Sequence, residues 1–268
     1  MERTFKSLEH QGWNERAAAY DSYTAKFTDY GIAPLIDAIC LSAGMSVLDV
    51  CCGTGRVSQA AANKHASVIG IDISAEMIAL AKAKALNCAF EVADAESLPF
   101  SNGVFDRVIC NFGLYHLPNP DQAIKDAARV LKRGGLYAFT TWCGPDKSPL
   151  FRILPEAIKD HGQLDVGLPP APPAFRLADQ NEARRDMTSV GFESIAFLDV
   201  PAVFECPENQ IIDFLAKSTV RMTMVLQAQA PAARDAIHLA IRDRLSVFAV
   251  GNVIRIPMPA ILVSGVKS

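Results

Sequence analysis

This sequence of 268 residues lacks several features that would place it in a broad class at once. It has no uninterrupted apolar run long enough to cross a membrane: the most apolar late segment, residues 246–266, includes an asparagine, an arginine and two prolines, which makes it a poor membrane span. The first six residues hold no apolar run either, so we expect no signal peptide. Internal repeats and low-complexity tails are absent. What remains is a chain that is half apolar, enough for the core of one large domain with or without a lid.

Two further absences concern charge and cysteine pairing. The formal net charge is −3 with no basic block, which argues against long RNA or DNA as a partner. The seven cysteines are odd in number and include no C-x-x-C pair, so we expect reduced thiols in the cytoplasm and no metal site. Adjacent thiols such as Cys51 and Cys52 could hold trivalent arsenic, but small apolar residues also suit a strand that meets a tight turn. We favour this second interpretation.

What the sequence does contain is a regular alternation of apolar runs and helical patterns. The predicted strands are 47–51, 67–71, 89–93, 105–111 and 136–141. Helices are predicted at 56–65, after Ser74, and at 121–131. Strands that alternate with helices in this way predict a parallel sheet with helices on both faces.

The alternation breaks in the second half of the chain. Residues 145–173 are rich in proline, and such a long irregular segment is usually a lid or a binding loop. Beyond it we predict helices at 182–190, 207–224 and 232–248, one long strand at 192–204, and a final strand at 254–266 interrupted by prolines. Near the start of the chain, the spacing from Trp13 to Phe27 predicts a helix laid over an apolar surface.

The most informative segment joins the first strand to the first helix. Gly53 and Gly55 form a turn after a buried strand, and the next strand ends in Asp72. Glycines let the backbone approach a ligand, and an acidic side chain at the second strand tip can bind a ribose diol. The third glycine of the dinucleotide motif is replaced by Ser58, and Asp49 precedes the turn, where a carboxylate repels a pyrophosphate and attracts a cation. These features favour S-adenosylmethionine, with its sulfonium and ammonium, over a nicotinamide dinucleotide.

Five blocks of this sequence resemble those of class I S-adenosylmethionine-dependent methyltransferases, in the broad group that includes ubiquinone and menaquinone C-methyltransferases and many small-molecule methyltransferases. The blocks lie at 47–55, 70–78, 93–100, 105–120 and 129–135. Their order and spacing match the family over about residues 10 to 142. The resemblance implies an α/β fold with a doubly wound, Rossmann-like sheet of seven strands, six parallel and the last antiparallel.

The same resemblance implies one methyltransferase domain over residues 1–268. Its core would comprise about 38–144, 178–206 and 250–268. A helical, proline-rich cap would comprise about 1–37, 145–177 and 207–249. The predicted cap is largely apolar, through Phe151, Leu154, Phe175, Phe214, Leu215, Met222, Met224 and Leu226. A mostly apolar pocket suits a small, largely hydrophobic methyl acceptor.

The resemblance also assigns roles toward the adenosine part of the cofactor. Asp72 would accept from both ribose hydroxyls. Asp94 would accept from the adenine amino group, with the Ala95 backbone beside it. Ile73 and Met77 would pack on the adenine ring, although Met77 is also a plausible plain core residue.

The methionine part of the cofactor would meet the other residues that the family motifs match. Gly53 and Gly55 would let the backbone approach it, and Asp49 would lie near it, directly or through water. The backbone around Asn111 would line the amine and the methyl group. Tyr20 would close over the cofactor from the N-terminal helix.

Two adjacent residues are the candidates for catalysis. Where the family often has paired histidines, this chain has Tyr115 and His116. A histidine here can act as a general base near neutral pH or hold its loop by a hydrogen bond, and Tyr115 can orient a substrate hydroxyl. His161 and His238, in the predicted cap, are further candidates for the base.

The predicted function is S-adenosylmethionine-dependent transfer of a methyl group to a small, largely apolar acceptor, by O- or C-methylation. Two alternatives belong to other classes. One is a nicotinamide-dependent oxidoreductase, which the missing third glycine and Asp49 disfavour. The other is a non-catalytic cofactor-binding protein with a methyltransferase fold, which only turnover would exclude.

Overall fold

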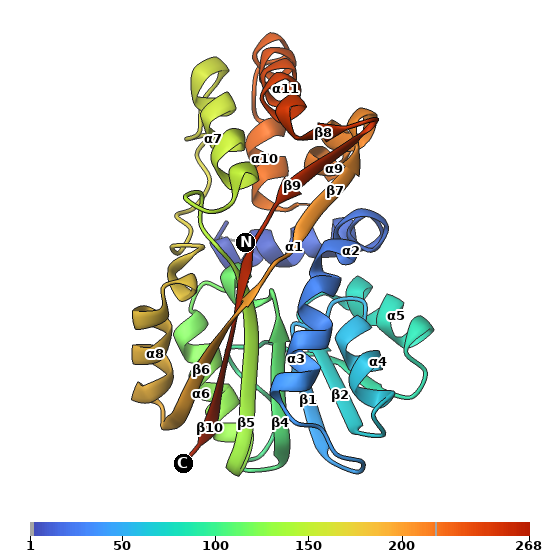
Figure 1. The fold of residues 1–268 in the computed structure, drawn as a ribbon, viewed down its shortest axis with the longest axis vertical. Coiled ribbons are helices and arrows are strands. Elements are labelled where there is room, and N and C mark those ends of the chain that lie inside the picture. Colours follow the sequence, from blue (N-terminus) through green and yellow to red (C-terminus); the bar gives the residue numbers. More distant parts are fainter. Residues whose placement is uncertain (1–2, 218) are drawn as a thin grey trace. The chain divides into compact units, whose positions relative to one another are not determined.

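The computed structural model describes residues 3–217 and 219–268, and the chain divides into two units (Figure 1). The larger unit comprises Thr28–Trp142, Ala171–Val200 and Ala260–Ser268. The smaller unit comprises the residues up to Phe27 together with Cys143–Pro170 and Pro201–Pro259.

The strands and helices follow one another along the chain with short turns between most of them. The strands are β1 (Ser46–Val50), β2 (Ser67–Asp72), β3 (Ala89–Val92), β4 (Phe105–Asn111), β5 (Leu131–Trp142), β6 (Phe192–Val200), β7 (Val203–Pro207), β8 (Ala249–Val250), β9 (Val253–Pro257) and β10 (Ala260–Lys267). The α-helices are α1 (Phe5–Ala19), α2 (Ala25–Thr28), α3 (Ile32–Ala38), α4 (Arg56–Ala62), α5 (Ala75–Lys84), α6 (Pro120–Val130), α7 (Pro149–His161), α8 (Gln180–Ser189), α9 (Ile211–Lys217), α10 (Arg221–Gln227) and α11 (Pro231–Leu245).

The larger unit is built on a seven-stranded sheet with the strand order β3-β2-β1-β4-β5-β10-β6 (Figure 1). Strands β1 to β5 are parallel, whereas β10 is antiparallel to both of its neighbours, β5 and β6. The central strands are buried: Leu48 and Val108, which pair in register, have no exposed surface. Burial on both faces explains why these strands appear in the sequence as apolar runs. The predicted fold class is confirmed, with six strands in one direction and β10 reversed.

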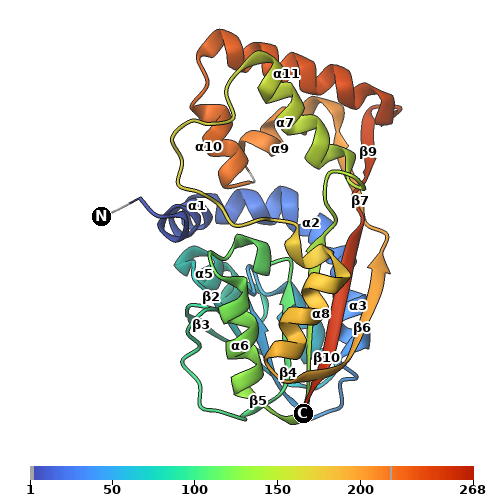
Figure 2. The ribbon, with the colours of Figure 1, turned by 90° about the vertical axis from the view of Figure 1, so that its left-hand side faces the viewer.

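Helices cover both faces of this sheet. α6 packs on α8, α3 packs on α4, and Figure 2 shows α6 and α8 on the face opposite to α3. The helix starts follow from local chemistry, since Ser74 Oγ accepts from the Met77 N–H (3.2 Å) and Asn119 caps α6, with Pro120 in its first turn. Because parallel strands end at one edge of a sheet, the segments that follow β1, β2 and β4 gather there.

The smaller unit contains helices and an antiparallel three-stranded sheet, β7-β9-β8, which the sequence did not predict. Phe27, Phe204 and Phe214 form an aromatic cluster with ring centroids 4.4–5.5 Å apart. Helix α7 packs on α11. The Gln229 side chain exchanges two hydrogen bonds with the backbone of Gln163 (2.9 and 2.7 Å).

Two predicted strands are wrong in extent. Residues 192–204 form β6 and β7 in different sheets, and residues 254–266 are likewise divided into β9 and β10. Each break contains a proline, Pro201 or Pro259, which lacks the N–H that a strand ladder needs. The consequence is that β7 and β9 belong to the smaller unit and not to the seven-stranded sheet.

Three further predictions need correction. Residues 145–173 are not irregular throughout, because α7 begins with Pro149 in its first turn, where a missing N–H costs nothing; the stretch 162–175 has no helix or strand. The helix predicted at 207–224 is two helices, α9 and α10, and the helix predicted at 232–248 is confirmed as α11 with a 3₁₀ turn at its end. The N-terminal helix is interrupted by a π-helix at Tyr20–Thr24. Among the residues that the structure describes, no helix is both long and apolar enough to cross a membrane.

Candidate functional site

The turn between β1 and α4 has an unusual backbone. Cys51, Gly53 and Gly55 have φ values of 57°, 53° and 81°, in the left-handed region that favours glycine. At Gly55 a side chain is excluded by packing as well, since a Cβ there would lie 2.9 Å from the Phe90 ring and 3.2 Å from the Ala81 methyl. The turn is therefore specified by conformation and by contact with α5 and β3.

Asp72, at the tip of β2, fastens this turn. Its two carboxylate oxygens accept from the backbone N–H groups of Gly53 (2.9 Å) and Ser74 (2.9 Å). The N-cap of α5 is Ser74 itself, so capping is not the task of Asp72. The half-buried carboxylate thus lies beside the glycine turn, where binding a ribose diol requires it.

Asp49 lies on β1 beneath the turn and is only 1% exposed. Its Oδ2 accepts from Ser58 Oγ at 2.6 Å. Burial raises the pKa of Asp49 to about 7, against the lowering effect of the Ser58 hydrogen bonds, and the charge of Asp72 raises it further. A cation close to this carboxyl would favour its ionised form.

Thr54 is a candidate that the sequence did not single out. Its side chain is 2% exposed, and Oγ1 has no hydrogen-bond partner among the residues that the structure describes. A buried hydroxyl without a partner costs about 1–3 kcal/mol, which a ligand group can recover. The signal was available, because a hydroxyl side chain stands between two turn glycines. The Thr54 hydroxyl and the neighbouring carboxyl groups of Asp49 and Asp72 suit a ligand with a positive charge and several polar groups. S-adenosylmethionine is such a ligand.

The residues predicted to contact adenine differ in exposure. Ile73, directly after β2, is half-buried, whereas Met77 is 3% exposed. Asp94 is half-buried and its Oδ1 accepts from the Glu96 N–H at 3.0 Å, while Ala95 is buried. Asp94 and Ala95 follow β3, at the same edge of the sheet as the glycine turn.

Asn111 ends β4, and its side chain holds the neighbouring segments together. Nδ2 donates to the Thr28 carbonyl (2.9 Å), and Oδ1 accepts from Thr140 Oγ1 (2.7 Å). The next residue, Phe112, has a φ of 55°, and its N–H donates to the same Thr140 hydroxyl at 3.0 Å. The Asn111 side chain is thus structural, which leaves the backbone for the predicted role beside the cofactor.

Tyr115 and His116 lie in a 3₁₀ helix, Leu114–His116, that follows β4 at this same edge. Both side chains are half-buried and their ring centroids are 3.9 Å apart. Tyr20 lies in the smaller unit, where it packs edge-to-face on Trp13 at 5.5 Å. The larger unit therefore contains all the predicted cofactor-binding residues except Tyr20, together with Tyr115 and His116.

The other candidate histidines belong to the smaller unit as well. His161 ends α7 and is exposed. His238, on α11, is half-buried, and burial lowers its pKa. In the part of the chain that the structure describes, no three His, Cys, Asp or Glu side chains are arranged to hold a metal ion. All seven cysteines are free thiols.

Comparisons with known proteins agree with this geometry. The profile of a family described as a methyltransferase domain matches residues 47–135. The ubiquinone/menaquinone biosynthesis C-methyltransferase of Coxiella burnetii is 31% identical over 172 residues, which cover 57% of this chain and 68% of that protein. The ubiquinone biosynthesis O-methyltransferase of the same organism is 35% identical over 134 residues, 45% of this chain and 57% of that protein.

The chain spans about half the length of several of the curated relatives that it matches. Among solved structures, the YcgJ protein of Bacillus subtilis is similar with a TM-score of 0.58 at 21% identity. The match covers 89% of this chain and 98% of that protein, and it supports the fold.

Proposed function

Because this chain belongs to the class I S-adenosylmethionine-dependent methyltransferases, we propose that it transfers a methyl group to a small, largely apolar acceptor by O- or C-methylation. The observation that carries this proposal is the glycine turn, in which Gly53 and Gly55 are left-handed and the Gly53 N–H donates to the strand-tip carboxylate of Asp72. Relatives named for quinone biosynthesis support a phenol- or quinol-type acceptor. A nicotinamide oxidoreductase is disfavoured by family membership and by the buried Asp49 beneath the turn.

Two groups of residues would hold the cofactor. Toward its adenosine, Asp72 would accept from the ribose hydroxyls, and the loop after β3, with Asp94 and Ala95, would meet the adenine beside Ile73 and Met77. Toward its methionine part, the residues would be Asp49, Gly53, Gly55, Thr54, the Asn111 backbone and Tyr20. The cofactor supplies a methyl group made electrophilic by its sulfonium.

The protein's own contribution to the reaction would be positioning and charge. The ionised form of Asp49 would stabilise the positive charge of the bound cofactor in a site with little water. Holding the acceptor in line with the methyl group is worth roughly 7–11 kcal/mol in well-oriented reactions. His116 would take the proton from an acceptor hydroxyl, with Tyr115 orienting that hydroxyl.

The apolar residues predicted for the acceptor pocket are of two kinds. Phe214 is 5% exposed and belongs to the aromatic cluster of the smaller unit, so its truncation would also affect packing. Met222 and Met224 are half-buried on α10 and are better placed to meet a ligand. We therefore expect Met222→Ala to raise the acceptor KM with little change in cofactor affinity.

A product-mass screen tests the proposed activity directly. The protein is incubated with S-adenosylmethionine and a panel of phenols, quinols, amines and carboxylates, and the products are examined for the gain of one methyl group. A methylated phenol or quinol supports the proposal. Cofactor binding without any product would favour a non-catalytic protein with this fold, and tight binding of NAD in place of S-adenosylmethionine would overturn the proposal.

His116→Ala tests the proposed base. General-base catalysis contributes about 10²–10⁴-fold, so kcat should fall by at least the lower figure and the acid limb of the pH profile should disappear. The affinity for S-adenosylmethionine should stay unchanged. A variant with normal kcat and an unaltered pH profile would show that His116 only shapes its loop, and would move the role to His161 or His238.

Three broader features remain part of the proposal. The two units would act as one methyltransferase domain, with the larger unit holding the cofactor. The chain would work in the cytoplasm, and its partners would be small molecules and not nucleic acid, as the net charge of −3 without a basic block indicates.

A further inference from the structure

Two cysteines lie at the ends of neighbouring strands beside the glycine turn. Cys110 is the sixth residue of β4, and Cys51 directly follows β1. The parallel register pairs Asp49 with Ile109, so Val50 stands next to Cys110 and Cys51 is one residue further on. Strands about 4.8 Å apart with a rise of about 3.3 Å per residue place the two Cα atoms about 6 Å apart. This is the usual Cα separation in a disulfide.

The backbone of Cys51 directs its thiol toward Cys110. In a regular strand successive side chains alternate between faces, so Cys51 would point away from the face that Val50 and Cys110 share. Its φ of 57° interrupts that alternation. As a result, the Cys51 sulfur lies beside Gly113, as the Cys110 sulfur does.

Gly113 provides the space for both sulfur atoms. A Cβ at this position would lie 2.4 Å from Cys51 Cβ, 2.8 Å from Cys110 Sγ and 2.9 Å from Cys51 Sγ. Its φ is −91°, which any residue adopts, so the backbone conformation does not require glycine there. The absence of a side chain at Gly113 thus serves the thiol pair, and both sulfurs lie within 2.9 Å of one point.

We propose that Cys51 and Cys110 are a disulfide-forming pair, oxidised by a peroxide, whose closure weakens cofactor binding. The half-buried Cys51 is the thiol that the oxidant reaches, because Cys110 is fully buried. The Cys51 sulfur attacks one peroxide oxygen, the O–O bond breaks, and a sulfenic acid and one water form. The Cys110 sulfur then displaces the hydroxyl of that sulfenic acid as a second water. Two thiols lose two electrons and two protons, and hydrogen peroxide becomes two waters.

The resting state of the pair is the dithiol. The neighbouring Cys110 thiol and burial raise the pKa of Cys51 well above its usual range, which keeps the thiolate scarce at neutral pH. Oxidation should therefore be slow and should accelerate as the pH rises. The pair responds to sustained peroxide, and a thiol reductant restores it.

Closure of the disulfide reaches the cofactor site through the turn. Cys51 begins the turn whose Gly53 N–H donates to Asp72. Drawing the Cys51 sulfur to bonding distance of Cys110 moves this backbone and disturbs that hydrogen bond. The effect on the cofactor rests on the proposed function, whereas the formation of the disulfide does not.

The test is carried out on the full chain with hydrogen peroxide as the oxidant. After treatment, free thiols are alkylated in denaturant, and the digest is searched for linked peptides that contain Cys51 and Cys110 with a mass loss of two hydrogens. We expect this linkage, a rise of at least tenfold in the Kd for S-adenosylmethionine, and recovery of both after dithiothreitol. Cys110→Ala should bind the cofactor normally before treatment and keep its affinity afterwards, and Cys206→Ala is a matched buried control that should behave as the unaltered chain.

Several outcomes would overturn the proposal. They are complete alkylation of Cys51 and Cys110 after peroxide, a Cys51–Cys52 linkage, and sulfinic acid at Cys51 without any disulfide. The linked-peptide measurement needs no variant, so a poorly folding Cys110→Ala does not weaken the test. If the untreated chain fails to bind S-adenosylmethionine, the proposed function is wrong. The mass of the linked peptides still shows whether the disulfide forms.

Discussion

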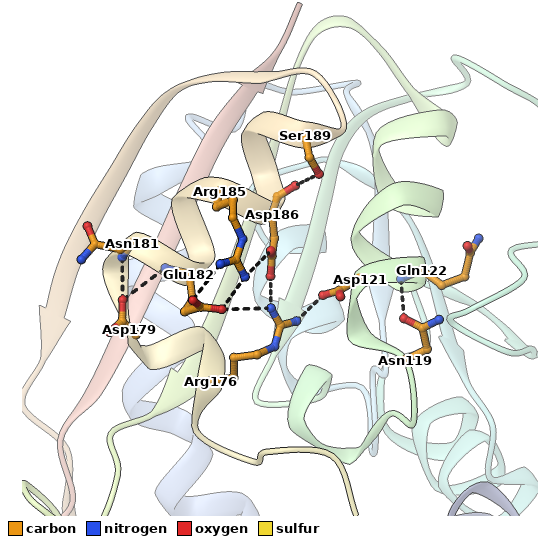
Figure 3. A network of polar contacts seen from close by, with 10 residues as sticks. All are labelled: Asn119, Asp121, Gln122, Arg176, Asp179, Asn181, Glu182, Arg185, Asp186 and Ser189. Atoms are coloured by element: carbon orange, nitrogen blue, oxygen red, sulfur yellow. Dashed lines mark hydrogen bonds and ion pairs between the residues drawn. The ribbon is translucent and has the colours of Figure 1, made fainter.

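Two polar regions of the larger unit are built on opposite principles. At the glycine turn, Cys51 and two glycines hold left-handed conformations, Asp49 is buried without a cationic partner, and Thr54 Oγ1 has no partner among the described residues. In the second region, formed by α6 and α8, the Arg176 guanidinium lies among three carboxylates: Asp121, Glu182 and Asp186 (Figure 3). There each carboxylate pairs with an arginine, and each helix start has its cap.

The difference separates binding from stability within one sheet. Strained backbone and uncompensated buried groups cost free energy in the folded chain, and such costs persist where a ligand recovers them. The Arg176 cluster instead ties the start of α6 to α8 through side chains that satisfy one another. We therefore expect substitutions at the turn to change ligand affinity and pH dependence, and substitutions in the Arg176 cluster to change stability alone.

The largest expected effect is the pH dependence of stability caused by Asp49. Its pKa is about 7 in the folded chain against 3.8 in the unfolded chain, so between these values the folded state holds a proton that the unfolded state has lost. Stability must then fall as the pH rises from about 4 to about 7, and level off above that. The fall should be about 4 kcal/mol, since one pKa unit corresponds to about 1.4 kcal/mol.

Urea unfolding of the original chain and of Asp49→Asn at several pH values measures the contribution of Asp49. The contributions of all other titrating groups cancel in the difference between the two free energies of unfolding. The amide keeps an acceptor for Ser58 but does not ionise. Asp106→Asn is the control with the opposite sign: Lys132 and Ser46 lower the pKa of Asp106 to about 2, so its contribution is lost only as the pH falls from about 4 to 2. If the difference in free energy of unfolding between the original chain and Asp49→Asn stayed constant from pH 4 to pH 8, Asp49 would be ionised in the folded chain over that whole range.

The next effect in size is the loss of cofactor affinity in Asp72→Ala. Charge-assisted hydrogen bonds are worth about 1.5–3 kcal/mol, which corresponds to a rise of roughly 10- to 150-fold in the Kd for S-adenosylmethionine. Calorimetric titration measures the affinity, and Asp72→Asn, which retains one acceptor oxygen, should lie between the alanine variant and the original chain. Unchanged affinity in the alanine variant would show that Asp72 does not bind the cofactor. The contrast between the two regions would then lose its main support.

Sequence patterns predicted the glycine turn, Asp72 and most of the sheet that carries them. β4 occupies the predicted residues 105–111, and Asp72, Gly53 and Gly55 lie at the predicted strand ends, because buried parallel strands and glycine turns have local signals. Local signals did not reveal that 192–204 and 254–266 each serve two sheets. Contacts between residues far apart in the chain decide where each strand ends. For example, the Met258 N–H, between β9 and β10, donates to the carbonyl of Ala202, between β6 and β7 (2.9 Å).

The Arg176 cluster was also beyond the reach of the sequence, for the same physical reason. Asp121 and Arg176 are 55 residues apart, and neither position carries a local pattern that predicts an ion pair. Thr54 is a different case, because its residue type and place between glycines were visible. What the sequence could not reveal was that its hydroxyl is enclosed without a protein partner.

The smallest expected effect concerns the Arg176 cluster, which we expect to contribute to stability and not to cofactor binding. Arg176→Met keeps much of the side chain's apolar contact but leaves Asp186, whose side chain is 11% exposed, without its guanidinium. We expect the free energy of unfolding to fall by about 1–2 kcal/mol, less than for a fully buried pair because the arginine is 20% exposed. The Kd for S-adenosylmethionine should not change. Arg185→Met is the matched control, since Arg185 pairs with Glu182 but is 63% exposed, and its loss should lower the stability less than the loss of Arg176 does. Chemical denaturation and calorimetric titration on the same preparations decide the matter. A loss of cofactor affinity in Arg176→Met at unchanged stability would show that the two regions are coupled, and that the division between binding and stability is wrong.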